Sequence, residues 1–257
     1  DAGEPGLPNV RVIDPTAHQY FVPFNDADLW DLFAEKTVCH GESIGESLVS
    51  SIFLVSSYDG TIYYYDHWED GYDVDSLVPG ATTEAGVLDA GAVQLFQSNI
   101  TKAGLGSGPP YLYDGRDRVT VFGEKATFVR MVYPTDPGTV LASAWEISEV
   151  ADWGTSFVTV LGEDLDFNGS VADDADFAGL SVMALLPNTQ VYYKGSLVAT
   201  LNAGGTYFIN GANDGAGGGG VDSTDTITAT APVQVQMLVG GCGSAYSGNG
   251  HSLEPID

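Results

Sequence analysis

The stretch Gly60-Thr61-Ile62-Tyr63-Tyr64-Tyr65 decides the fold, because the chain repeats it in altered form as Asn188-Thr189-Gln190-Val191-Tyr192-Tyr193. Both runs are rich in β-branched and aromatic residues, which favour strands. The first run begins with a turn dipeptide, Asp59-Gly60, in which glycine adopts a positive φ without a steric penalty. Each run therefore predicts a β-strand.

Three more pairs of segments match in the same order along the chain. They are Leu88–Gly91 with Leu201–Gly204, Asp117–Thr120 with Asp225–Thr228, and Val129–Met131 with Val235–Met237. Self-similarity of this kind indicates one structural unit used twice. We predict an all-β protein made of two tandem copies of a β-sandwich-like unit, with one short helix.

The repeat also sets the expected domain boundaries. We expect an N-terminal arm at residues 1–10, a first β unit at 11–134, a linker at 135–144 and a second β unit at 145–257. The apolar segment at residues 10–24 either pairs within its own sandwich, which we favour, or adds to an open sheet edge of a neighbour.

The short helix is expected near the end of that segment. Asp28 is the expected N-cap, and Leu29, Leu32 and Phe33 would share one face of the helix.

The chain is strongly acidic, with 35 Asp and Glu against 8 Lys and Arg and a formal net charge of −27. A field of that sign repels nucleic acid and acidic membrane surfaces, so neither is an expected partner. No apolar stretch approaches the roughly 20 residues that span a bilayer. The excess acid indicates either a saline habitat or a need for solubility, or carboxylates that hold Ca²⁺.

The chain begins at Asp1, which we interpret as removal of an upstream signal sequence. Its two cysteines, Cys39 and Cys242, lie in different halves. In an exported protein they could form one disulfide between the halves, and two separate buried thiols are the slightly less favoured alternative.

The first copy carries an acidic insertion between Tyr65 and Leu88 that the second copy lacks, and long loops tend to be functional. Three roles compete for it. Asp66, Glu69, Asp70 and Asp73 are candidate Ca²⁺ ligands. Trp68 and Tyr72, with Tyr63 and Tyr65, are candidate contacts to a partner. The third role is a solvated acidic loop with Trp68 folded into its own core.

A second acidic stretch lies in the other half. Its candidate ligands are Asp164, Asp166, Asn168, Asp173, Asp174 and Asp176. The run from Asp164 to Gly169 matches the opening of an EF-hand loop, but its twelfth position is Ala175 rather than Glu and no amphipathic helices flank it. A looser calcium loop and an ordinary acidic turn therefore both remain open.

One motif resembles a known family. The run Tyr64-Tyr65-Asp66-His67-Trp68-Glu69-Asp70-Gly71-Tyr72 resembles a signature of large bacterial cell-surface proteins, in which segments like Tyr113–Asp117, Pro137–Ala142 and Trp153–Phe157 follow. The second copy, at Asn188, Leu201 and Ala231–Val235, is similar to the N-terminal region of IgG-Fc-binding-type proteins. The resemblance implies an extracellular β-rich module of surface structures and supplies no catalytic residues.

We therefore expect an extracellular or cell-surface bacterial protein that is not an enzyme. Paired carboxylates suit glycoside hydrolysis, but acids are so abundant here that a nearby pair carries little information. The four histidines show no zinc-type spacing. The expected function is a structural subunit that assembles with itself, or with other surface proteins, into a filament, sheath or adhesive layer, with Ca²⁺ as its one candidate cofactor. The alternative is an adhesin module that binds a polysaccharide or glycoprotein.

Overall fold

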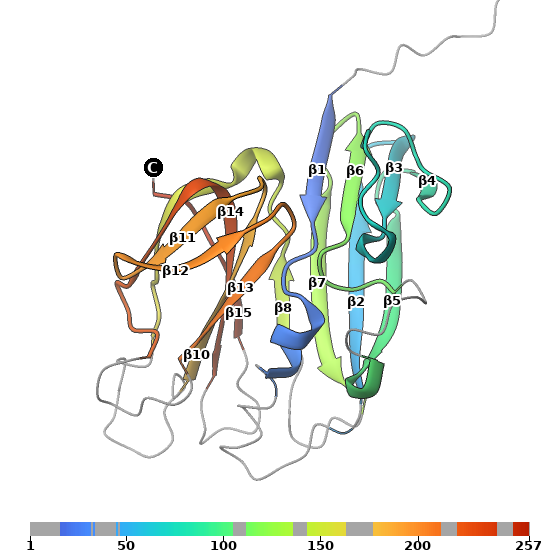
Figure 1. The fold of residues 1–257 in the computed structure, drawn as a ribbon. Helices are drawn as coiled ribbons and strands as arrows, with labels where there is room; N and C mark the ends of the chain where they lie inside the picture. The colour runs from blue at the N-terminus through green and yellow to red at the C-terminus, as the bar shows by residue number, and fades with distance from the viewer. Residues whose placement is uncertain are drawn as a thin grey trace, which may run out of the picture.

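The fold was analysed in a computed structural model that describes residues 16–31, 33, 45, 47–104, 112–135, 143–162, 177–211, 220–240 and 249–256. Within these residues the chain consists mainly of antiparallel strands (Figure 1), as the sequence predicts. Three short 3-10 turns, η1 (Trp68–Asp70), η2 (Lys102–Gly104) and η3 (Val150–Asp152), interrupt them. None of the described helices is long and apolar enough to cross a membrane.

The first half is a sandwich of two four-stranded sheets. One sheet has the order β1-β6-β3-β4, and the other has the order β5-β2-β7-β8. The strands are β1 (Ala17–Phe21), β2 (Ser47–Val55), β3 (Thr61–Asp66), β4 (Glu84–Leu88), β5 (Val93–Thr101), β6 (Arg118–Phe122), β7 (Thr127–Pro134) and β8 (Ser143–Glu146). Alternate residues of β7 are buried, as expected for a strand with one face on the core.

The second half has seven strands arranged around one long strand. They are β9 (Gly154–Val158), β10 (Phe177–Ala184), β11 (Thr189–Tyr193), β12 (Ser196–Leu201), β13 (Thr206–Asn210), β14 (Thr226–Gly240) and β15 (Asn249–Leu253). The first part of β14 pairs with β9 and β11, and its last part pairs with β10 and β15. A register shift between Thr228 and Val233 separates the two parts.

The pairing pattern is the same in the two halves. The order β1-β6-β3-β4 corresponds to β9-β14-β11-β12, and the order β5-β2-β7-β8 corresponds to β13-β10-β14-β15. The single strand β14 therefore takes the positions that β6 and β7 occupy separately in the first half.

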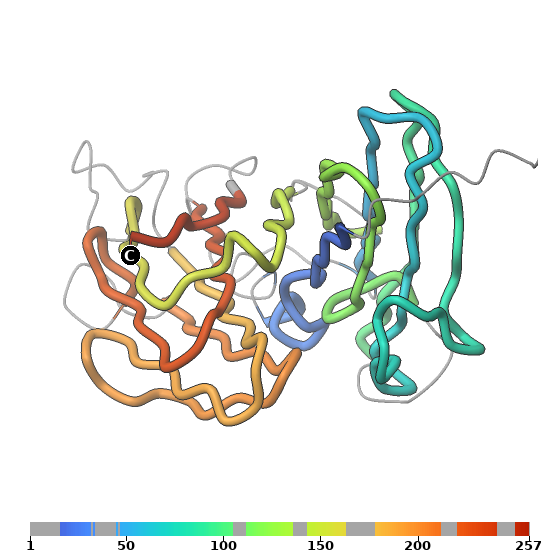
Figure 2. Tube along the Cα trace, turned by 90° about the horizontal axis from the view of Figure 1, so that it is seen from above, coloured from blue at the N-terminus to red at the C-terminus, as the bar shows by residue number. Residues whose placement is uncertain are grey.

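Each half has its own apolar core, and a third cluster joins them. This cluster packs the helical segment, at residues 26–31 and 33, and Trp145 of β8 against Leu238 and Phe208 of the second half. The Trp145 indole N–H also donates to the carbonyl oxygen of Met237 at 3.0 Å. The two sandwiches lie side by side, with the helical segment at one end of the contact (Figures 1 and 2).

The start of the helix differs from the prediction. Asn25, not Asp28, is the N-cap, because its side-chain Oδ1 accepts the N–H of Asp28 at 2.9 Å. Asp28 is then the third helical residue, and its carboxylate interacts with Asn25 and with Thr206 of the second half. Leu29 and Phe33 are buried as expected.

The structure also places two segments near the expected boundaries. β1 pairs with β6 of its own sheet, so residues 17–21 follow the favoured alternative. β8 is hydrogen-bonded to β7 and so extends a sheet of the first half, although its last two residues lie beyond the boundary expected at residue 145.

Candidate functional site

The acidic residues of the insertion do not form one group. Asp66 forms an ion pair with Arg118 (Oδ2–Nη2 2.5 Å) and also accepts the N–H of Asp73 at 3.1 Å. Asp73 in turn accepts the N–H of Gly80 at 2.7 Å, and Asp70 accepts the hydroxyl of Thr82 at 2.6 Å. These three carboxylates therefore organise the loop itself, and their expected role as calcium ligands stays a prediction.

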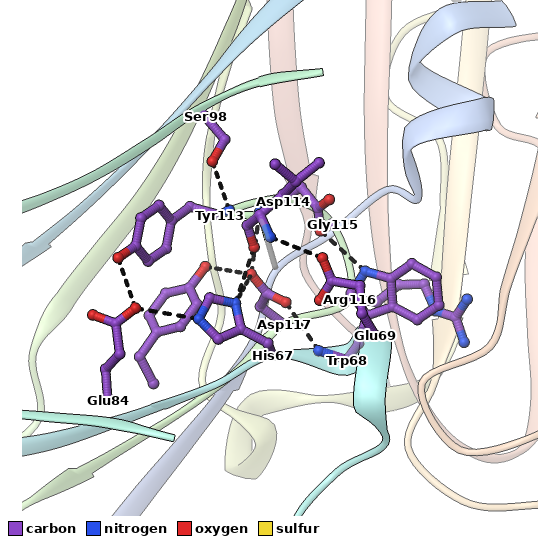
Figure 3. Close-up of polar contacts among 12 residues, drawn as sticks. His67, Trp68, Glu69, Glu84, Ser98, Tyr113, Asp114, Gly115, Arg116 and Asp117 are labelled. Atoms are coloured by element: carbon purple, nitrogen blue, oxygen red, sulfur yellow. Dashed lines mark hydrogen bonds and ion pairs between the residues drawn. The ribbon is translucent and has the colours of Figure 1, made fainter. Parts of the chain in front are cut away.

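The Glu69 side chain contacts a different segment of the chain, at Leu112. Its Oε1 accepts the backbone N–H of Leu112 at 2.9 Å, whereas its Oε2 is buried and has no hydrogen-bond partner among the described residues. Leu112 begins the segment that carries Asp114 and Asp117, so Glu69 joins a group of carboxylates formed by residues distant in the sequence (Figure 3).

Asp114 and Asp117 form a tight turn directly before β6. The N–H of Asp114 donates to Asp117 Oδ2 at 3.1 Å, and the hydroxyl of Tyr65 donates to the same oxygen at 2.6 Å. Trp68 contacts both carboxylates: its backbone N–H donates to Asp117 at 3.2 Å and its indole N–H to Asp114 at 3.0 Å. Both aspartates are buried, with exposed fractions of 2 % and 0 %.

The backbone of this turn depends on a glycine. A Cβ at Gly115 would lie 1.5 Å from the carbonyl oxygen of Phe24, so no other residue fits unless the chain moves. Arg116 follows with a φ of 82°. Its guanidinium lies over the Trp68 ring at 4.2 Å, and its Nε donates to the carbonyl of Gly204 in the second half at 3.0 Å. Arg116, which lies between the two aspartates in the sequence, thus takes part in the contact between the halves.

Burial and neighbouring carboxylates both act on the protonation of this group. Burial raises the pKa of Asp114, and the nearby carboxylates of Asp26 and Asp117 raise it further. Burial also raises the pKa of Asp117, and Glu69 adds to the increase. Arg130 is fully buried nearby, but its side chain bonds to Asp26, to Ser50 and to two backbone carbonyls.

His67 is the basic side chain closest to Asp117 among the described ion pairs, with Nδ1 3.8 Å from Oδ2. One ligand atom from each of His67, Glu69 and Asp117 lies within 4.8 Å of the others, close enough to hold a metal ion. However, Nδ1 is 3.0 Å from the carbonyl oxygen of Leu112. A carbonyl only accepts, so Nδ1 carries a proton, and the other ring nitrogen, Nε2, lies 3.3 Å from Glu84 Oε1. The group thus combines one imidazole with the carboxylates of Glu69 and Asp117.

The aromatic residues expected to contact a partner make contacts within the protein. Tyr65 is fully buried and packs on Phe96 (centroids 4.4 Å apart), and Tyr63 is also in the core. Tyr72 packs edge-on against Phe21 and donates its hydroxyl to the carbonyl of Arg116 at 2.6 Å. Trp68 is partly buried under Arg116. Their role in partner binding stays a prediction.

Several expected site residues lie outside the described residues. These are Asp164, Asp166, Asn168, Asp173, Asp174 and Asp176 of the EF-hand-like stretch, and both cysteines, Cys39 and Cys242.

Sequence reasoning missed Asp114, Asp117 and Asp26. The sequence does contain a signal for the first two. Asp114 lies three residues before Asp117, where a repeated segment begins, and Asp222 lies three residues before Asp225, where the matching segment begins.

Comparison with known proteins adds no relative. No family model matches the chain, and neither the curated proteins nor the solved structures contain a match.

Proposed function

We propose that this chain is a structural module of a bacterial cell surface that assembles with copies of itself. The observation that carries the proposal is a pair of sheet edges with which no further described strand pairs. In the first half β4 and β5 each end their sheet on the same side of the sandwich (Figure 1). Three apolar side chains there, Val87, Val93 and Leu95, are 65 %, 57 % and 45 % exposed. Unpaired apolar edges are the usual templates for strand addition.

The occupant we propose for this edge is a second copy of the chain. The second half presents an open edge strand of its own, β12, on which Leu197 is exposed. The β4–β5 edge and β12 lie at opposite ends of the molecule (Figures 1 and 2). A contact between two different edges is head-to-tail and need not close into a ring, so it favours a filament. Because each copy has a formal charge of −27, cations are expected to promote the assembly.

The resemblance to bacterial surface proteins and the matched pairing of the two halves agree with this proposal. We infer that one unit was duplicated, and that the copies kept their strand order while their loops diverged. The alternative function, an adhesin module for a polysaccharide or glycoprotein, has less support. Stacking on sugars needs accessible rings, and two of its four expected tyrosine and tryptophan residues, Tyr63 and Tyr65, are buried.

The test is electron microscopy and sedimentation of the purified protein with Ca²⁺ and with EGTA. The double variant Val87→Lys/Leu95→Lys places two charges on the edge and should remain monomeric under conditions in which the wild type forms filaments. Val160→Lys is the matched control, since Val160 is equally exposed but lies outside the strands. A wild type that stays monomeric in both conditions, or a double variant that still assembles, contradicts the proposal.

A further inference from the structure

One face of the first sandwich carries no charged side chain. Ile52 of β2, Phe96 of β5 and Phe128 of β7 point into the core, so the alternate residues of these strands point away from it. The outward residues are the odd-numbered positions of 47–55, 93–101 and 127–133, and none of them is Asp, Glu, Lys, Arg or His. We call these outward residues the β2 face, after the strand at its centre.

The middle of the β2 face is apolar. The strand register places Phe53 between Leu95 and Val129, and Met131 and Tyr133 continue the row along β7. Leu95 is 45 % exposed, and the other four side chains are partly exposed. Aromatic residues and methionine are enriched in the cores of protein interfaces, where charged residues are depleted. This composition stands out in a chain with a formal charge of −27.

The corresponding face of the second half, on β10 and β14, is already an interface. Met183, Gln234 and Leu238 point away from the core of that half and are at most 3 % exposed. The Gln234 amide donates to the carbonyl oxygen of Phe21 at 2.9 Å, and Leu238 packs against Trp145. The outward residues of β10 and of the last part of β14 are also uncharged. In the second half, therefore, an uncharged face of this sheet is covered by another copy of the repeated unit.

The second half of the same chain does not cover the β2 face in this way. The face extends from β7 to β5, and β5 lies on the side of the first sandwich away from the second half (Figure 1). Among the described residues, no apolar cluster joins a side chain of the β2 face to the second half. The hydrogen bond from Gln97 Nε2 to Ser51 Oγ, at 2.7 Å, pairs two polar groups of the face with each other.

We propose that the β2 face packs against the β2 face of a second copy of the chain. Two uncharged faces can meet without burying a carboxylate, whereas most other surfaces of so acidic a chain would bring acids onto the apolar row. Sheets pack face to face about 10 Å apart, with their side chains interdigitated. Such a contact is two-fold and closes on itself, so it gives a dimer or joins two filaments side by side.

This contact shares with the proposed function the premise that copies of the chain associate, but it uses a sheet face instead of the β4–β5 edge and β12. Leu95 belongs to both surfaces. Val87 belongs only to the edge, because it lies on β4 of the other sheet, and Met131 belongs only to the face. Variants at Val87 and Met131 therefore separate the two contacts.

The experiment is sedimentation velocity of Val87→Lys over a range of protein concentrations, in EGTA and with salt to screen the net charge. We expect a reversible species of twice the 27.0 kDa monomer mass. Adding Met131→Glu should weaken this dimer at least about a hundredfold, because two carboxylates would be buried without partners. A mixture of the Met131→Glu and Met131→Lys proteins should recover part of the dimer, since opposite charges then meet across the contact.

The matched control is Leu186→Glu, which places the same charge on a side chain that is 47 % exposed in the turn after β10. It should leave the dimer unchanged. Met131 is partly exposed, so the circular dichroism of its variants should match the wild type. Val87→Lys that stays monomeric at every concentration, or Met131→Glu that dimerises as strongly as Leu186→Glu, would overturn the proposal. Filaments of Met131→Glu without lateral pairs would support it and retain the edge contact, so the two proposals fail independently.

Discussion

The first and second halves share a strand order and an aspartate turn, in which the N–H of Asp114 donates to Asp117 and the N–H of Asp222 donates to Asp225. The two turns nevertheless place their aspartates in different surroundings. In the second half the turn is partly exposed, and the Lys194 and Asp222 side chains are 37 % and 36 % exposed. In the first half the same turn is buried beneath the insertion and the helical segment. The difference shows that one backbone arrangement supports either a lysine at the surface or a desolvated acidic site, depending on what the adjoining loop covers.

A second corresponding pair of residues follows the same pattern. Arg130 of β7 matches Gln236 of β14 in the repeat, and both side chains are buried. Arg130 donates to the carbonyls of Pro23 and Phe24 at 2.6 and 3.0 Å and lies 3.4 Å from Asp26. Among the described residues Gln236 makes neutral bonds: it donates to the backbone carbonyl of Glu146 and accepts from the hydroxyl of Ser252. The first half thus carries buried charge where the second half carries buried amide.

The largest effect is expected from giving the first half the residue of the second. Arg130→Gln should lower the free energy of unfolding by about 3–5 kcal/mol, because it leaves Asp26 and two buried carbonyls without their partner. Gln236→Leu removes neutral hydrogen bonds and should cost about 1–2 kcal/mol. Urea unfolding monitored by tryptophan fluorescence measures both. Similar losses in the two variants would show that buried charge does not distinguish the halves.

An intermediate effect concerns alkaline pH. Tyr20 pairs with Val119 in β6, and Phe157 pairs with the corresponding Ile227 in β14. Burial raises the pKa of Tyr20 from 10.0 to about 12. The neutral phenol is thus favoured in the folded state. The stability it confers is complete below pH 10 and is lost as the pH rises through about 12, up to about 2.7 kcal/mol for two pH units.

The test is thermal unfolding at a series of alkaline pH values. Tyr20→Phe gives the first half the aromatic ring of the second and should flatten the decline between pH 10 and 12. It loses the hydroxyl bond to the carbonyl of Ala126, so its stability at neutral pH should be slightly lower. A decline of the same slope in wild type and variant would assign the alkaline sensitivity to other groups.

The smallest effect is expected at the aspartate turn of the second half, where Lys194 pairs with Asp222 and Asp225. Lys194→Gln removes the ammonium from the aspartate pair and should cost only about 0–1 kcal/mol, since the site is more than a third exposed. The same change should create a weak Tb³⁺ site, because the two carboxylates are left without their cation. Lys102→Gln alters a surface lysine away from this turn and serves as the control. Unchanged Tb³⁺ stoichiometry in Lys194→Gln would show that the aspartate turn alone does not attract a cation.

The all-β class was predictable because the strand runs and the turns between them are local features. The N-cap was not, because Asn25 and Asp28 are both good capping residues and only the chain direction after Phe24 decides between them. The candidate site was partly predictable. Glu69 belonged to the expected set, but its neighbours Asp114 and Asp117 lie more than forty residues away, and their approach depends on the pairing of β3 with β6. Asp66, Asp70 and Asp73 looked equivalent to Glu69 in sequence, yet local hydrogen bonds use their oxygens.

The long strand β14 has a consequence for the order in which the chain folds during synthesis. Everything the first half needs for its two described sheets has been made once β8 is complete at Glu146. In the second half β14 is an inner strand of both strand orders, β9-β14-β11-β12 and β13-β10-β14-β15, so β9 to β13 emerge before their central partner exists. Until β14 begins at residue 226, the described strands of this half can form only the β11–β12 hairpin and the pairing of β10 with β13. The second half is therefore the part of the nascent chain that exposes unpaired edges longest and most needs protection from aggregation.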